Sequence, residues 1–250
     1  MTRKSKGVMS EFLEIIKEAK AQGPVDQNHV CQFCSKRFVK ESTLAAHLCE
    51  NKRRNQQRDE IGVRLAFQAY LRFYELTQGS AKKRTYDDFV RSSYYVAFTK
   101  FGRHLHSIRA VNPTSFIEYV IKNNKKLDHW CKDKLYEEYL LQYLQKENPQ
   151  DALERGIMEM QVWADEEKSV VKDFFRYANT NKIAAMITNG RVSPWLIYCS
   201  DTGQACLGRF NDEQVAMVYA WIDPELWQRR LKTYAADAEW CRNILTQAGF

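Results

Sequence analysis

The sequence is poor in the residues that interrupt regular structure, with only ten glycines and five prolines among 250 residues. This scarcity excludes a low-complexity, collagen-like or loop-rich chain. No apolar run reaches the roughly 18 residues that a membrane-spanning helix needs. The N-terminal segment also lacks the continuous apolar stretch of a secretory signal. We therefore expect an intracellular protein that does not enter a membrane.

The short motifs of common enzymes are missing as well. The chain contains no P-loop, no GxSxG, no HExxH and no glycine-rich dinucleotide turn. His104 and His106 are too close in sequence to share one helix face. The acidic run 165–167 is typical of a solvated helix surface. We predict a protein that is not an enzyme, with a metal-dependent nuclease built from scattered carboxylates as the catalytic alternative.

What the sequence has is helical periodicity over most of its length. Apolar residues recur at helical spacing in 10–20 and again from Ile61 to Gly79. Helix starts are marked by Asn112-Pro113, Asn148-Pro149 and Asp223-Pro224, because proline is favoured in the first turn after a capping residue. These signals predict a mostly α fold.

One stretch lacks helical signals. Residues 191–210 contain proline, glycine and β-branched residues, and they predict a loop with a short hairpin. Within this stretch Trp195 either faces a partner or is buried in a connection between helices. The composition favours neither alternative.

Four potential metal ligands cluster near the N-terminus, in CQFCSKRFVKESTLAAHLCE. Cys31 and Cys34 are separated by two residues, and twelve residues separate Cys34 from His47. Two thiolates from one tight turn and an imidazole at this distance can bind a single Zn²⁺ ion. The remaining four cysteines are scattered, which is typical of buried thiols in a reducing compartment.

This stretch resembles a C2H2-type zinc finger, whose pattern C-x2-C-x3-F-x5-L-x2-H is matched without insertion, with Phe38 and Leu44 at the two apolar positions. The resemblance implies a small ββα module in which zinc supplies folding energy. The family's second histidine is missing, and Cys49 is the candidate fourth ligand. On an ideal helix His47 and Cys49 would point about 200° apart, so both can bind one ion only if the helix ends near Leu48. His29 is the alternative ligand.

Charge is distributed unevenly along the chain, whose net charge is +7. Residues 61–135 carry 14 Lys and Arg against 6 Asp and Glu, whereas residues 136–250 carry 12 against 17. A basic N-terminal half favours an anionic partner, and nucleic acid is the commonest.

Basic side chains gather at and after the finger. By the family pattern, Lys40 and Thr43 occupy base-reading positions, but a single finger covers only about three base pairs. We therefore expect the finger to position or dock the protein, with phosphate contacts from the basic groups that follow. The predicted nucleic-acid contacts are Lys40, Thr43, Lys52, Arg53, Arg54, Arg58, Lys82, Lys83 and Arg84.

A further basic group around Lys100 and Arg103 is accompanied by four aromatic residues, Tyr94, Tyr95, Phe98 and Phe101. Rings interleaved with cations can stack unpaired bases. The spacing of Tyr95, Phe98 and Phe101 is also that of a helix facing a core, and we favour the core.

The whole chain also resembles zinc-finger proteins of tailed bacteriophages, through the run HLCENKRR and the aromatic-rich helical region behind it. This implies a place in the infected host cytoplasm. We predict an N-terminal helix (1–24), a zinc finger with a basic extension (25–54) and a helical domain (55–250). The expected function is that of a zinc-binding accessory protein of phage replication or transcription, with DNA favoured over RNA as its partner. The alternative is an adaptor that docks on a polymerase or helicase.

Overall fold

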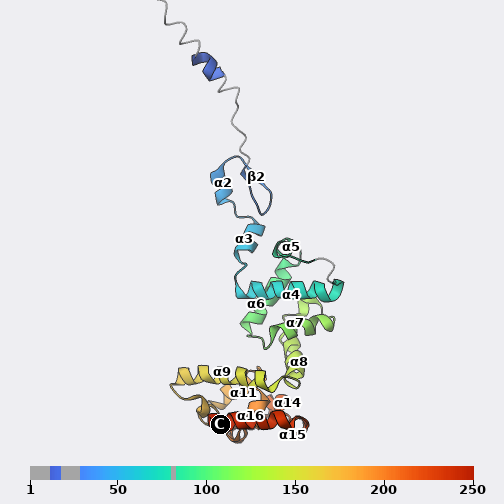
Figure 1. The fold of residues 1–250 in the computed structure, drawn as a ribbon, viewed down its shortest axis with the longest axis vertical. Helices are drawn as coiled ribbons and strands as arrows, with labels where there is room; N and C mark the ends of the chain where they lie inside the picture. The colour runs from blue at the N-terminus through green and yellow to red at the C-terminus, as the bar shows by residue number, and fades with distance from the viewer. Residues whose placement is uncertain (1–11, 18–28, 80–82) are drawn as a thin grey trace, which may run out of the picture.

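The computed structural model describes residues 12–17, 29–79 and 83–250, and it is mostly α-helical, as the sequence predicts (Figure 1). The part of the chain described contains one sheet, of two short strands. No helix in this part is long and apolar enough to cross a membrane. Residues 12–17 are helical and lie within the predicted helix 10–20, whose remaining residues at both ends lie outside the described residues.

The N-terminal module is a ββα unit followed by a second short helix. Strands β1 (His29–Val30) and β2 (Arg37–Phe38) pair antiparallel, with His29 opposite Phe38. Helix α2 (Glu41–Ala46) follows, and α3 (Glu50–Gln56) begins after a three-residue break. Figure 1 shows the module at one end of the helical body. The predicted ββα element is therefore confirmed.

A first apolar core forms between residues 63 and 144 and is rich in aromatic rings. Its helices are α4 (Ile61–Gln78), α5 (Tyr86–Arg91), α6 (Tyr95–Ser107), α7 (Pro113–Lys122), η1 (Leu127–His129) and α8 (Asp133–Leu144). Tyr70, Phe89, Phe101 and Phe116 are at most 1% exposed. The dense ring packing explains the high aromatic content of this half of the chain.

A second core lies between residues 152 and 250. Its helices are α9 (Pro149–Glu167), η2 (Val171–Asp173), α10 (Phe174–Tyr177), α11 (Thr180–Thr188), α12 (Pro194–Tyr198), α13 (Asp201–Leu207), α14 (Asp212–Ile222), α15 (Pro224–Thr233) and α16 (Ala235–Ala248). Trp195 and Trp227 meet edge to face at its centre, with ring centroids 5.6 Å apart. The helical region predicted as one domain thus contains two apolar cores, with α8 leading from one to the other (Figure 1).

The capping signals place the helices correctly. Asn112, Asn148 and Asp223 cap α7, α9 and α15, each with proline at the start of the helix. The predicted loop at 191–210 is wrong, because α12 and α13 fill most of it. Ser193 and Ser200 cap these helices through their hydroxyls.

The boundary predicted between residues 54 and 55 falls inside α3. This helix packs against α5: the Tyr86 hydroxyl donates to the Arg54 carbonyl at 2.9 Å. The basic extension of the finger is therefore attached to the first helical core.

Candidate metal centre

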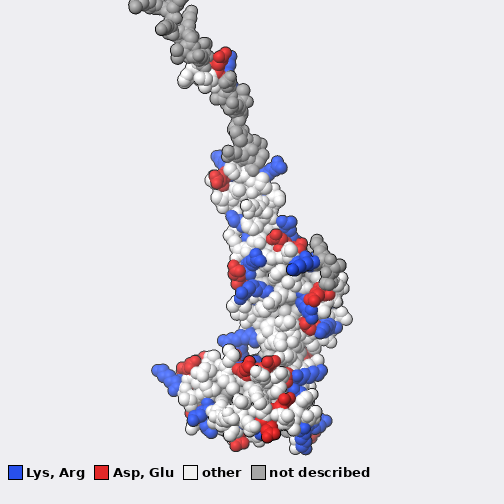
Figure 2. Space-filling view, viewed as in Figure 1, with Lys and Arg blue, Asp and Glu red and all other residues white. Residues whose placement is uncertain are grey.

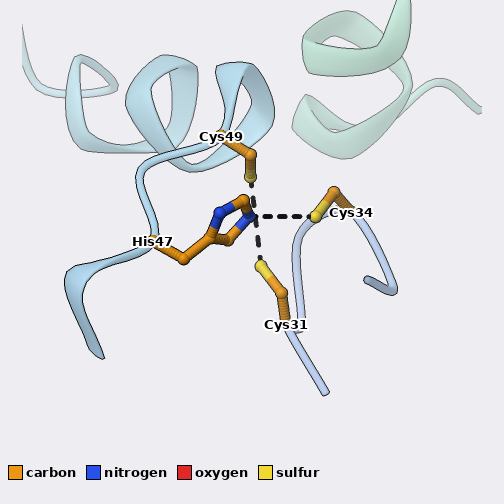
Figure 3. A group of neighbouring side chains, drawn as sticks. All are labelled: Cys31, Cys34, His47 and Cys49. Carbon is orange, nitrogen blue, oxygen red and sulfur yellow. Dashed lines mark hydrogen bonds between the residues drawn. The ribbon is translucent and has the colours of Figure 1, made fainter. Parts of the chain in front are cut away.

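Four side chains converge between the hairpin and the helix break, as Figure 3 shows. Cys31 and Cys34 come from the turn that joins β1 to β2, in which the Ser35 amide donates to the Cys31 carbonyl at 2.8 Å. Ser35 adopts a φ of 58°, which lets the chain reverse within the turn. His47 and Cys49 come from the two sides of the break between α2 and α3.

The helix break solves the geometric problem that the spacing of His47 and Cys49 poses. Helix α2 ends at Ala46, and His47 is its C-cap residue with extended backbone angles of −72° and 116°. Cys49 is also extended and caps α3, its sulfur accepting from the Lys52 amide at 3.4 Å. The two side chains are no longer on one helix, so both reach the same point in space. The break therefore covers residues 47–49 and includes Leu48, where the sequence requires the helix to end.

The distances fit a tetrahedral zinc site. One ligand atom from each of the four residues lies within 4.8 Å of all the others. The Cys31 and Cys49 sulfurs are 3.9 Å apart, and the Cys34 sulfur is 3.2 Å from His47 Nε2. With ordinary Zn–S and Zn–N bond lengths, a tetrahedron requires separations of about 3.8 Å between sulfurs and about 3.5 Å between sulfur and nitrogen. The cluster can therefore hold a metal ion, and its Cys3His donor set is typical of structural zinc.

The electrostatics of the two hairpin thiols also suit a cation. Burial opposes ionisation of Cys31, but hydrogen bonds from the amides of Cys34 and Phe33 and from the thiols of Cys34 and Cys49 together hold the pKa of this thiol below its ordinary value. The Lys36 amide favours the thiolate of Cys34, yet desolvation and the neighbouring thiols Cys31 and Cys49 raise its pKa overall. Adjacent thiolates repel one another, and a bound divalent ion would remove that repulsion.

Residues around the cluster fix its geometry. The rings of Phe38 and His47 pack with their centroids 4.7 Å apart. The Asn51 side chain donates to the Phe33 carbonyl at 3.0 Å, and Lys52 Nζ donates to the His47 carbonyl at 3.2 Å. Sequence reasoning missed both contacts, because Asn51 and Lys52 appear only as parts of a polar, basic run. His29 lies in β1 and is not a member of the cluster.

The residues predicted to contact nucleic acid differ in their exposure and in their interactions within the protein. Lys40 and Thr43 are exposed at the start of α2. Arg53 is 58% exposed and pairs with Glu50, whereas Arg58 is exposed with its guanidinium 5.0 Å from the Tyr86 ring centroid.

Arg54 is different, because its side chain is only 15% exposed. Its guanidinium lies 4.4 Å from the centroid of the Tyr95 ring and donates from Nη1 to the Val90 carbonyl at 2.6 Å. The residue holds α3 against α5 and α6.

The predicted contacts at residues 82–84 also differ from one another in exposure. Lys83 is exposed, whereas the Arg84 guanidinium covers the Tyr74 ring at 3.7 Å. Lys82 lies outside the described residues.

Of the four aromatic residues weighed as base-stacking candidates, three are core residues and Tyr94 is exposed. Tyr95, Phe98 and Phe101 are at most 4% exposed. Trp195, the residue left open between a partner face and the interior, is fully buried.

No known protein family matches this chain, and neither a curated protein nor a solved structure is significantly similar to it. The assignment of the finger therefore depends on the spacing and the geometry of its own residues.

The contrast between Arg54 and Arg53 gives a test of how the finger is attached. We expect Arg54→Ala to lower the free energy of unfolding by about 1–3 kcal/mol, because it removes a ring contact and leaves the Val90 carbonyl without this donor. Arg53→Ala, one position away and exposed, is expected to change it by less than about 0.5 kcal/mol. Urea denaturation of both variants measures the difference. Equal losses would mean that Arg54 does not hold the two parts together.

Proposed function

We propose that this chain is a non-enzymatic nucleic-acid-binding accessory protein, in which a zinc-held finger and the helix behind it grip the phosphate backbone. The observation that supports this most is the placement of α3. A metal ion held by the four-residue cluster would order the chain up to Cys49, and Arg54 fixes α3 to the helical body. Lys40, Arg53 and Arg58 remain exposed on this stretch and in the turn just after it. Exposed cations on a rigid support suit phosphate contacts.

The arrangement favours modest, salt-sensitive binding over strong sequence recognition. Figure 2 shows Lys and Arg side chains interspersed with Asp and Glu along this face, without a continuous basic stripe. A single finger offers too few base contacts for specificity by itself. DNA as the preferred partner, and a place in phage replication or transcription, extend the proposal on the strength of the sequence resemblance alone.

The test compares two triple variants that remove the same amount of charge. Lys40→Ala/Arg53→Ala/Arg58→Ala removes three exposed cations of the finger, α3 and the turn after it, whereas Lys146→Ala/Arg229→Ala/Lys232→Ala removes three exposed cations of the second half. Arg54 is kept in both, because its loss would disturb the fold. Binding of labelled duplex DNA, single-stranded DNA and single-stranded RNA is measured by anisotropy across a salt series.

We expect the finger variant to bind duplex DNA at least tenfold more weakly at low salt, about 1.4 kcal/mol or more. Its plot of log affinity against log salt should be shallower by about 2–3, since each lost phosphate contact removes about 0.9 from the slope. The matched variant should behave as the wild type. If both variants lose equal affinity, binding is a general effect of net charge. No binding of DNA or RNA by the wild type would favour the adaptor that docks on a protein.

A further inference from the structure

The first helical core carries an open cavity of about 500 Å³ that the zinc module does not use. It lies between the C-terminal end of α4, the start of α6 and the segment that runs from the end of α7 into η1. Phe98 and Trp130 form a buried floor, each 1% exposed, and Phe73 and Tyr74 form a wall. A cavity of this size with mainly apolar walls is typical of a small-ligand site.

Tyr94 stands at the rim and is 53% exposed. It directly precedes α6, and no ring contact to it exists among the described residues. The neighbouring Tyr95, Phe98 and Phe101 are all buried in the core, so Tyr94 is the aromatic residue of this run that is available to a ligand. An exposed ring above an aromatic cavity suits a flat, unsaturated ligand. Such a ligand can stack with one face on Tyr94 and the other on the buried rings, which the fold already holds in place.

The polar residues of the rim narrow the chemistry further. Asn124 lines the cavity and is exposed, and its primary amide offers two donors and an acceptor. Lys126 is exposed and makes no ion pair within the described ranges, and Lys125 lies 3.6 Å from Glu138. No carboxylate appears among the lining residues that are described. The aromatic rings, the amide and the one lysine without an ion pair, Lys126, together match a base and a phosphate.

We propose that this cavity binds a nucleotide, with the base stacked on Tyr94 over the aromatic floor and its phosphate against Lys126. The nucleotide is either an unpaired residue of a bound strand or a free mononucleotide. The first source rests on the proposed function and would add recognition of single-stranded DNA or RNA to the backbone grip of the finger. The second does not depend on the finger.

The test uses the full-length, zinc-loaded protein and four variants. Tyr94→Ala and Lys126→Ala alter the rim of the cavity. Tyr177→Ala is the control and removes a tyrosine of the second core that is 72% exposed. The finger triple variant, Lys40→Ala/Arg53→Ala/Arg58→Ala, again tests the contribution of the finger. The probes are a twelve-residue oligothymidylate, an abasic strand of the same length, and thymidine monophosphate. Anisotropy gives the strand affinities, and calorimetry gives that of the mononucleotide. Circular dichroism confirms that each variant is folded.

If a strand occupies the cavity, Tyr94→Ala should bind oligothymidylate about tenfold more weakly, and Lys126→Ala severalfold more weakly. The abasic strand should bind Tyr94→Ala within twofold of the wild type, and Tyr177→Ala should bind every probe normally. Thymidine monophosphate that binds the wild type and not Tyr94→Ala would identify the free nucleotide as the source.

Unchanged affinity of both rim variants for both base-bearing probes would overturn the proposal, as would equal wild-type affinity for the abasic strand and oligothymidylate with no mononucleotide binding. Failure of the finger proposal gives a different result. In that case the finger triple variant binds like the wild type, whereas the affinities of Tyr94→Ala still decide whether the cavity binds a nucleotide.

Discussion

Cys31→Ser is expected to abolish stoichiometric zinc binding and to unfold residues 29–49 while the helical body stays folded. Cys31 is the buried ligand of the four, 3% exposed, and its sulfur faces that of Cys49 across the site. Phe38 and Leu44 are only partly buried, and each fully buried apolar side chain contributes only about 1.5–3 kcal/mol. Structural zinc contributes about 10–16 kcal/mol in modules of this kind. Without the metal, the small apolar core cannot hold the hairpin and α2 together.

The measurement is zinc content per chain, combined with amide NMR spectra. Cys131→Ser is the matched control, because Cys131 is a partly buried cysteine that packs on the first helical core and is not a member of the cluster. It should retain one zinc and an unchanged finger spectrum. In Cys31→Ser, amides of 29–49 should move to random-coil positions while those of α4 and α6 keep theirs. A Cys31→Ser protein that still holds one zinc would show that the other three residues bind it with a different partner.

Acidification should release the metal from the wild-type protein, because protons compete with zinc for three thiolates and an imidazole. The finger signals should disappear together with the zinc as the pH falls. The signals of the helical body provide the internal reference.

The metal site was predictable because its information is local. Two cysteines separated by two residues, such as Cys31 and Cys34, are brought together by a single tight turn. The distance to His47 is set by one hairpin and one short helix. The sequence alone indicates only that Cys49 can join His47 as a ligand if the helix ends between them. The structure meets this condition at Ala46, because the backbone turns extended at His47 and Cys49 caps the next helix.

The sequence predicts most of the helices, but it does not predict how they pack against one another. Asparagine or aspartate before proline marks a helix start by itself, so α7, α9 and α15 follow from two residues each. The short helices α12 and α13 were missed because their stability comes from burial. Trp195, Leu196 and Ile197 are at most 1% exposed, and tertiary packing of this kind overrides a weak local preference.

The role of Arg54 could not be predicted for a related reason. In the sequence it is one of three consecutive cations that include Arg53 and Lys52. Only the fold brings the Tyr95 ring and the Val90 carbonyl, 41 and 36 positions away in the chain, to its guanidinium. A cation that looks free in sequence is here a structural contact.

Gly102→Ala is expected to disrupt the first helical core, with a loss of about 3 kcal/mol or more in the free energy of unfolding. Gly102 lies in α6 where it crosses α4. A β-carbon built there would come within 2.1 Å of the Gly62 carbonyl oxygen and 2.4 Å of the Ala66 amide nitrogen. Both are backbone atoms of a helix, so no side-chain rotation can make room, and the two helices must move apart. Alanine's better helix propensity, about 1 kcal/mol, cannot offset this clash.

Gly208→Ala is the control, because the added carbon would meet only the Ala205 carbonyl oxygen at 3.4 Å. Its free energy of unfolding should change by less than about 1 kcal/mol. Chemical denaturation of both variants, followed together with zinc content, separates the helical body from the metal site. Gly102→Ala should retain one zinc, since its clash lies in the α4 and α6 pair and touches none of the four ligands. It should lose the Tyr94-dependent binding, because the cavity is built between α4 and α6. A Gly102→Ala protein as stable as the wild type would contradict the close packing of these helices, and with it the frame on which the cavity depends.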